Sequence, residues 1–143
     1  MDFDTQHPLL LACRNLGAAF DAHDALMAER LGVSRNELRL LNRLEGGPSS
    51  QVDLADHLHV SRAAVTVIVD RLTAAGLVVR ETSPTDRRVK LVNLIPKVWQ
   101  VLGLHYRPAG QRVLGVADDM SAADVERLTE NLRAISDAIS PAS

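Results

Sequence analysis

The chain has few aromatic residues, one cysteine and no long apolar run, and each shortage excludes something. Aromatic residues make up 3% of its 143 residues, so the core is expected to consist mainly of Leu, Val, Ile and Ala. One cysteine cannot form an internal disulfide, which fits a reducing compartment. No segment is long enough to span a bilayer, and the apolar run before Cys13 is too short for a signal peptide. We therefore expect a cytoplasmic protein that does not contact a membrane.

Common catalytic and metal-binding motifs are also missing. The sequence contains no phosphate-binding loop, no Gly-x-Ser-x-Gly and no His-Glu-x-x-His. The five histidines include His57 and His59 before a helix, but no pair has a spacing typical of a metal site. We expect no enzyme, no cofactor and no metal. The length and the 46% hydrophobic content fit one globular domain.

Charge is distributed unevenly along the chain. The net charge is −2, which at first argues against a nucleic-acid partner. Residues 58–97, however, carry seven Lys and Arg against three Asp and Glu, whereas the flanking segments 1–57 and 98–143 are both acidic. A basic segment of this length can arise by chance on a solvated surface. It is also the electrostatic pattern of a nucleic-acid contact.

The spacing of apolar residues, near 3.6, predicts a mainly helical fold. Ser34 with Glu37 predicts a capping box, and Gly32 and Gly76 are suited to end helices. Pro108 should kink its helix or split it near Arg107. The predicted helices are 8–31, 34–45, 51–57, 62–75, 97–118 and 121–139.

Two apolar segments after the fourth helix predict strands. Residues 77–79 and 89–95 are rich in β-branched side chains, and residues 82–86 between them form a polar turn. The order of helix, short helix, tight turn, helix and hairpin is that of a winged helix-turn-helix. The fold class is therefore mainly α with a small β-hairpin wing.

The fourth helix has two different faces. Val65, Ile68, Val69 and Leu72 form a stripe that should face the core. The opposite face is small or basic, with one acid, Asp70, nearby; such a face is slim enough for a DNA major groove. Ser61 and the free N–H groups at the start of this helix could hold a phosphate. The candidate DNA-contacting residues here are Ser61, Arg62, Ala63, Thr66, Val67 and Thr73.

The hairpin tip carries Arg87 and Arg88 beside Asp86. An arginine on a narrow loop can enter a minor groove, where A·T tracts have the most negative potential. We expect Asp86 to orient one arginine through a bidentate pair while the other stays free. Taken alone, two arginines in a loop are more typical of ordinary surface charge, and only the preceding helices favour a DNA contact.

Several segments between residues 38 and 97 resemble the core of MarR-family regulators. The resemblance implies a homodimer that binds a pseudo-palindromic operator, most commonly as a repressor, and in many members is released by a small molecule. It further implies dimerisation segments at 1–33 and 97–143, which are intertwined in the homodimer, and a winged helix-turn-helix at 34–96 on each side. The matching segments are Leu54–Ala55, Val60–Thr66, Val69–Leu72, Ala75–Val78, Asp86–Arg88, Leu91, Leu94 and Pro96–Lys97.

Two positions depart from the family pattern. Many members carry a polar or basic residue where this chain has Val67, and valine can touch a thymine methyl but cannot hydrogen-bond a base edge. Recognition of bases would then rest on Arg62, Thr66 and the wing. Pro108 is the second departure, and it could alter the dimerisation helix.

The signal that such a regulator senses is left open by the sequence. The family layout suggests a pocket for a small aromatic or phenolic effector between the dimer helices and the winged domain. Cys13 could act as a redox sensor, although it lies in an apolar stripe, where most cysteines are inert. A winged helix used only for protein contacts is a further alternative. The candidate residues for the effector pocket are Leu16, Phe20, His23, Trp99 and His105.

Overall fold

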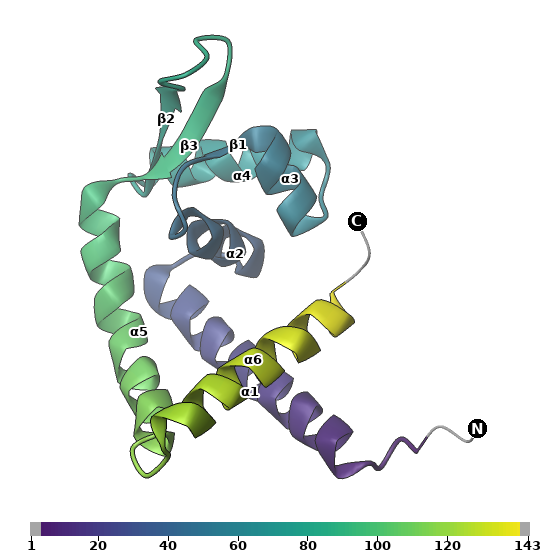
Figure 1. The fold of residues 1–143 in the computed structure, drawn as a ribbon. Helices are drawn as coiled ribbons and strands as arrows, with labels where there is room; N and C mark the ends of the chain where they lie inside the picture. The colour runs from purple at the N-terminus through teal and green to yellow at the C-terminus, as the bar shows by residue number, and fades with distance from the viewer. Residues whose placement is uncertain (1–3, 141–143) are drawn as a thin grey trace. The chain divides into compact units, whose positions relative to one another are not determined.

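The computed structural model describes residues 4–140, in which the chain forms six helices and three short strands (Figure 1). Two compact units result, the first ending at Leu102 and the second starting at Gly103. The first unit holds α1 to α4 and the whole sheet. The predicted fold class, mainly helical with a hairpin wing, is confirmed.

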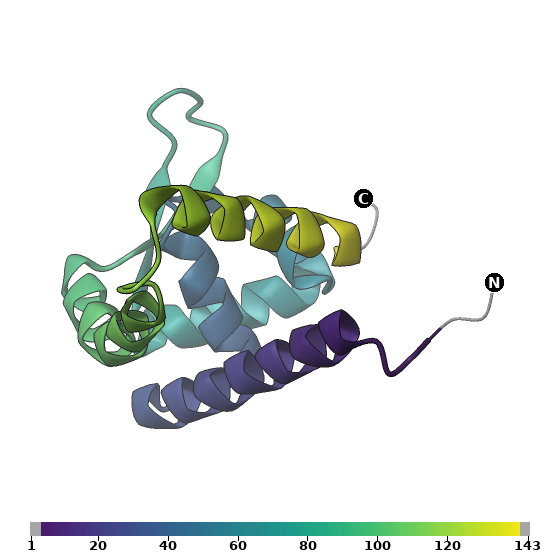
Figure 2. The ribbon, with the colours of Figure 1, turned by 60° about the horizontal axis from the view of Figure 1, so that its bottom comes forward.

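The first two helices begin and end at the residues that the sequence indicates. α1 (Pro8–Leu31) is one unbroken helix (Figure 2) and ends at Gly32, whose φ of 67° is left-handed. α2 (Arg35–Leu44) starts after Ser34, whose hydroxyl accepts a hydrogen bond from the Glu37 N–H at 3.1 Å. Glu37 returns the contact by accepting from the Ser34 N–H at 2.8 Å, which completes the predicted capping box.

The next two helices form the helix-turn-helix. α3 (Gln51–Leu58) is capped by Ser50, and α4 (Arg62–Ala74) is capped by Ser61. His59 joins them in a left-handed conformation with φ of 54°. This conformation turns the chain within a few residues, so that α4 can pack back against α3 and α2.

The sheet has three antiparallel strands in the order β1-β3-β2. β1 is Ser49–Ser50, β2 is Val78–Thr82 and β3 is Lys90–Leu94. The predicted hairpin is confirmed, and its loop projects beyond the helices of its unit in both views (Figures 1 and 2). Two details differ from the prediction: β2 extends to Thr82 through polar residues, and β1 adds a third strand. Two serines after a Gly-Gly-Pro segment carry no alternation, so β1 has no sequence signal.

Aliphatic side chains fill the core of the first unit, as the composition predicts. The core lies where α2, α3 and α4 meet the sheet, and no aromatic residue of the described chain is among its buried members. Leucines from three helices contribute most of the buried volume. The fully buried side chains include Leu38, Leu41, Leu44, Leu54, Leu58, Val65, Val69, Leu72, Val92 and Leu94.

The last two helices bury little. α5 (Pro96–Val116) starts in the first unit, where Val98 and Leu102 are buried, and continues into the second. It runs unbroken through Pro108, so the predicted split near Arg107 does not occur; one missing N–H is outweighed by the hydrogen bonds of the turns on either side. α6 (Ala122–Ile139) has no buried residue. Across residues 4–140, no helix has the length and apolar character needed to cross a membrane.

Replacing His59 by glycine should stabilise the protein. A non-glycine residue in the left-handed region costs about 1–2 kcal/mol, and glycine adds about 0.5–1 kcal/mol of unfolded-state entropy, so His59→Gly should gain about 0.5–1 kcal/mol. Urea unfolding at one fixed protein concentration measures the change. His59→Ala keeps the strain and is the control; equal stability of the two variants would contradict the assignment.

Candidate nucleic-acid interface

α4 has an exposed outer face on which most side chains are small. Val65, Val69 and Leu72 are buried, and Ile68 is half-buried. On the opposite side Val67 is 54% exposed. The side chains that the sequence assigns to this face, Arg62, Ala63, Thr66, Val67 and Thr73, are all exposed. The result is a slim ridge with one long cation near its start.

All three hydroxyls assigned to this interface, those of Ser61, Thr66 and Thr73, form hydrogen bonds with backbone groups of α4. The Ser61 hydroxyl accepts from the Ala64 N–H at 3.1 Å, and the Thr73 hydroxyl donates to the Val69 carbonyl at 2.7 Å. The first hydrogen bond of the helix runs from the Val65 N–H to the Ser61 carbonyl. The N–H groups of Arg62 and Ala63 therefore stay free at the positive end of the helix dipole. Two such N–H groups can hold a phosphate oxygen.

A chain of polar contacts connects this ridge to α3 and the wing. Arg80 of β2 contacts the Asp70 carboxylate at 2.6 Å through Nη2, and its Nε donates to Gln51 Oε1 at 3.1 Å. Gln51 Nε2 donates to Thr66 Oγ1 at 3.0 Å. The Thr66 hydroxyl donates in turn to the Arg62 carbonyl at 3.1 Å. The one acid on the outer side of α4 is thus paired with a cation.

Sequence reasoning missed Gln51 and Arg80. A signal was present, since alternation along β2 places Arg80 on the same side as the buried Val78, where a charge needs a partner. Its partners lie 10 and 29 residues away along the chain, so only the fold identifies them.

The wing loop is held by its own short side chains. The buried Ser83 hydroxyl accepts from the N–H groups of Thr85 and Asp86 at 3.3 and 3.4 Å. Asp86 Oδ1 accepts from the Arg88 N–H at 3.0 Å and lies 3.4 Å from Arg88 Nε. Asp86 therefore does orient one arginine, but through a single oxygen and not through the bidentate pair expected.

The two wing arginines remain available to a ligand. The Arg88 side chain is 93% exposed even with its Asp86 contact. Arg87 makes no side-chain hydrogen bond or ion pair with another residue of 4–140 and is exposed. The hairpin therefore presents two cations at a tip whose backbone is fixed by the Ser83 and Asp86 contacts.

None of the residues suggested for an effector pocket is among those that line the pocket described below. Leu16, Phe20 and Trp99 are exposed, and His23, half-buried, lies 3.9 Å from the Asp24 carboxylate. His105 belongs to the second unit. Cys13 is half-buried on α1.

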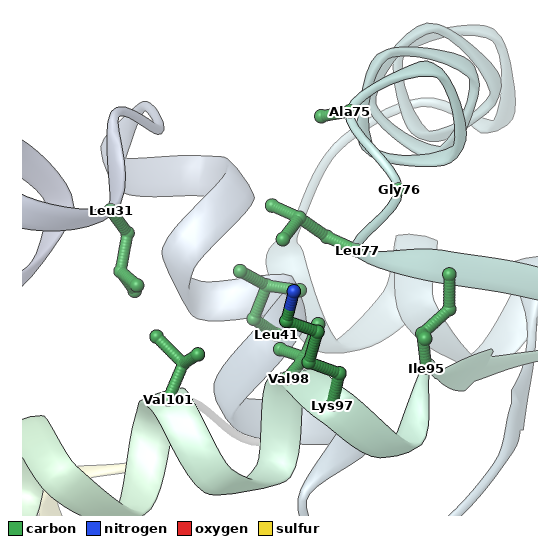
Figure 3. Close-up of a pocket in the computed structure, with 9 residues that line it drawn as sticks. All are labelled: Leu31, Leu41, Ala75, Gly76, Leu77, Ile95, Lys97, Val98 and Val101. Carbon is green, nitrogen blue, oxygen red and sulfur yellow. The ribbon is translucent and has the colours of Figure 1, made fainter.

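A pocket of about 230 Å³ opens elsewhere in the first unit. It lies between the end of α1, α2, the α4–β2 connection and the start of α5, and Lys97 is its one charged lining residue (Figure 3). Lys97 makes no hydrogen bond or ion pair with another described residue. In Figure 3 its side chain extends from α5 toward Leu41 and Leu77. The lining residues are Leu31, Leu41, Ala75, Gly76, Leu77, Ile95, Lys97, Val98 and Val101.

The histidines near the interface do not form a metal site. Burial, followed by the charges of Arg43, Arg39 and His59, lowers the pKa of His57. Burial and the neighbouring cations therefore both favour the neutral form of His57. Within residues 4–140, no cluster of three His, Cys, Asp or Glu side chains could hold a metal ion.

Comparison with known proteins identifies the family. The MarR family model matches residues 31–89, which include α2, the helix-turn-helix, β2 and the wing loop up to the start of β3. An HTH-type transcriptional regulator of Bacillus subtilis, YcgE, is 30% identical over 115 residues, covering 79% of this chain and 74% of YcgE. A putative transcriptional regulatory protein for the hcr operon of Thauera aromatica is 33% identical over 115 residues, covering 78% and 67%.

Solved structures support the same fold. The transcriptional regulator BldR of Sulfolobus solfataricus superposes with a TM-score of 0.62 at 27% identity, covering 92% of this chain and 93% of BldR. NadR in complex with 4-hydroxyphenylacetate gives 0.68 at 20% identity, covering 94% and 97%. A MepR variant of S. aureus bound to an oligodeoxyribonucleotide gives 0.60 at 15% identity, covering 94% and 100%. Sequence, fold and relatives agree: the chain belongs to the MarR family of winged-helix, DNA-binding transcriptional regulators and is not an enzyme.

Proposed function

We propose that this regulator is a cytoplasmic repressor that binds a pseudo-palindromic operator as a homodimer. The observation that carries the proposal is the outer face of α4, which is slim, has its one carboxylate paired, and is followed by a wing with two available arginines. The helix-turn-helix and wing of one protomer recognise one half-site, and a dimer places two of them on one operator. The DNA-bound MepR variant has the same fold and supports this use of it.

Within this proposal, the two ends of α4 have different tasks. The free N–H groups of Arg62 and Ala63 hold a phosphate at the helix start. The Arg62 side chain, exposed and without a partner among the described residues, contacts a base edge, and Val67 packs on a thymine methyl. Thr73, whose hydroxyl is engaged, contributes its methyl at the far end of the ridge. Arg87 and Arg88 enter the adjacent minor groove.

Exposed apolar side chains support the homodimer. α6 buries none of its residues in the single chain, and α5 leaves Val116 75% exposed. On α1, Phe20 is 58% exposed. Apolar surface of this extent is typical of a protein interface. We place the dimerisation segments at 1–33 and 97–143 and the DNA-binding region at 34–96, with residues 1–3 and 141–143 outside the described chain. The large exposed apolar side chains of these segments are Leu9, Leu16, Phe20, Leu26, Trp99, Leu104, Val113, Leu114, Val116, Leu128, Leu132 and Ile139.

We further propose that a small aromatic or phenolic acid releases the DNA. NadR, of the same fold, is a complex with 4-hydroxyphenylacetate. In this chain the apolar pocket beside Lys97 offers hydrophobic walls and one cation, the chemistry that an aromatic carboxylate needs. The earlier candidates Leu16, Phe20, His23, Trp99 and His105 remain a second proposed location, one that a dimer would have to complete.

Removing both wing arginines tests the DNA-binding assignment. Arg87→Ala/Arg88→Ala should weaken operator binding about 10-fold to 100-fold and lower the salt dependence, because two cations leave the DNA. Fluorescence anisotropy at two salt concentrations measures both. Arg30→Ala, an exposed arginine in the last turn of α1, is the control. If the double variant binds like the control, the wing assignment is wrong.

Arg62→Ala tests the base contact. The variant should lose about 1–3 kcal/mol of binding free energy and relax the preference at particular base pairs. Competition with duplexes carrying single base-pair changes measures the preference. An equal loss on every duplex would identify Arg62 as a phosphate contact and contradict the assignment.

A thermal-shift screen of phenolic and aromatic acids tests the effector proposal. A ligand at 100 times its Kd should add about 2.7 kcal/mol of stability. The shift should disappear in Lys97→Met and persist in His23→Ala if the pocket of Figure 3 is the site. A shift lost in His23→Ala but kept in Lys97→Met would move the effector to the second location, and no shift with any acid would contradict the proposal.

A further inference from the structure

The series of side-chain contacts Asp70–Arg80–Gln51–Thr66 connects three elements, β2, α4 and α3, through one cation. Arg80 is a half-buried strand residue, and its guanidinium uses Nη2 for Asp70 and Nε for Gln51. These three side chains come from β2, α4 and α3, which are the three elements next to the proposed DNA contact. Each partner therefore depends on the same cation.

Asp70 would oppose DNA binding if it were unpaired. It lies four residues after Thr66, so both side chains point from the same side of α4. Its side chain is 61% exposed, and its carboxylate carries the only negative charge on the outer side of the helix. The 2.6 Å contact with Arg80 neutralises that charge at the surface where phosphates would approach.

Arg80 sets the donor and the acceptor of each hydrogen bond in the Asp70–Arg80–Gln51–Thr66 series. An arginine Nε–H can only donate, so the Gln51 oxygen must face it and the Gln51 amide nitrogen must face Thr66. Thr66 Oγ1 thus accepts from Gln51, and its own proton goes to the Arg62 carbonyl. A hydroxyl has one donor and two acceptor positions, so Thr66 keeps one lone pair and its methyl for a ligand.

We propose that Arg80 is a positioning residue for sequence recognition, an inference that rests on the proposed function. It neutralises Asp70 and, through Gln51, presents Thr66 to DNA as an acceptor without a free donor. In a major groove such a group accepts from an adenine or cytosine amine or packs on a thymine methyl, and it cannot donate to guanine. Arg80 thus supplies specificity without touching a base.

The experiment separates charge from positioning with four variants. Arg80→Met removes both functions. Arg80→Met/Asp70→Asn removes the carboxylate that would otherwise be unpaired, but Gln51 still lacks the hydrogen bond from Arg80. Arg80→Lys keeps a cation for Asp70 but lacks the second donor group, equivalent to Arg80 Nε, that binds Gln51. Gln51→Ala removes the side chain that connects Arg80 to Thr66 and leaves the Asp70–Arg80 pair in place. It therefore serves as the independent test if an Arg80 variant fails to fold.

Each variant is titrated by anisotropy against the operator selected by the wild type, a random duplex and operators with single base-pair changes. Arg80→Met should bind even random duplex about 3-fold to 10-fold more weakly, because Asp70 repels phosphate. The double variant, Arg80→Lys and Gln51→Ala should bind random duplex within about 2-fold of the wild type. All three should lose a preference of about 10-fold at the base pair facing Thr66.

The outcomes distinguish this inference from the proposed function. Wild-type protein that selects no duplex overturns the proposed function, and this inference with it. Wild-type protein that selects an operator, together with a Gln51→Ala or double variant that keeps every base preference, overturns the positioning role alone. An Arg80→Met variant that binds random duplex as tightly as the wild type overturns the charge role.

Discussion

Burial of one side of α4 fixes the orientation of this helix and, with it, the face that the helix exposes to solvent. Val65, Val69 and Leu72 must be covered by α2, α3 and the sheet, because an aliphatic stripe left in water loses the main favourable contribution to folding. Once that side is buried, rotation of the helix is fixed and the side chains of the opposite face are fixed with it. The face that we propose for DNA contact is therefore set by the core and not by contacts of its own side chains.

Local electrostatics allows a chain with net charge −2 to bind a polyanion. Two acids are paired at α4: Asp70 of the helix itself with Arg80, and the buried Glu37 with Arg71 at 3.3 Å. Glu37 also caps α2, so one carboxylate both starts that helix and connects it to α4. The proposed surface then keeps Arg62 and Arg87, whose side chains have no partner among residues 4–140, and Arg88, whose side chain stays 93% exposed beside Asp86.

Elements with local signals were predictable from sequence, and contacts between distant segments were not. Ser34, Glu37 and Gly32 mark helix ends through interactions within a few residues, and the structure forms them as expected. β1 and the outer half of β2 are strands only because β3 supplies their hydrogen bonds, so their own polar residues gave no indication. The same reason hid the Gln51–Arg80 contact, which spans 29 residues. The outer face of α4 was predictable because one helix defines it, whereas the pocket beside Lys97 takes residues from four segments.

Sequence-specific DNA binding by α4 and the wing can be measured by fluorescence anisotropy of the unmodified protein against duplexes tiled from the region upstream of its own gene, at two salt concentrations. We expect one duplex with two-fold symmetry to bind well above random sequence, and its affinity to fall as salt rises because binding releases counterions from the phosphates. Affinity for every duplex at the level of random DNA, followed by failure of a random-library selection to enrich any sequence, would contradict the account and indicate a winged helix that binds proteins instead.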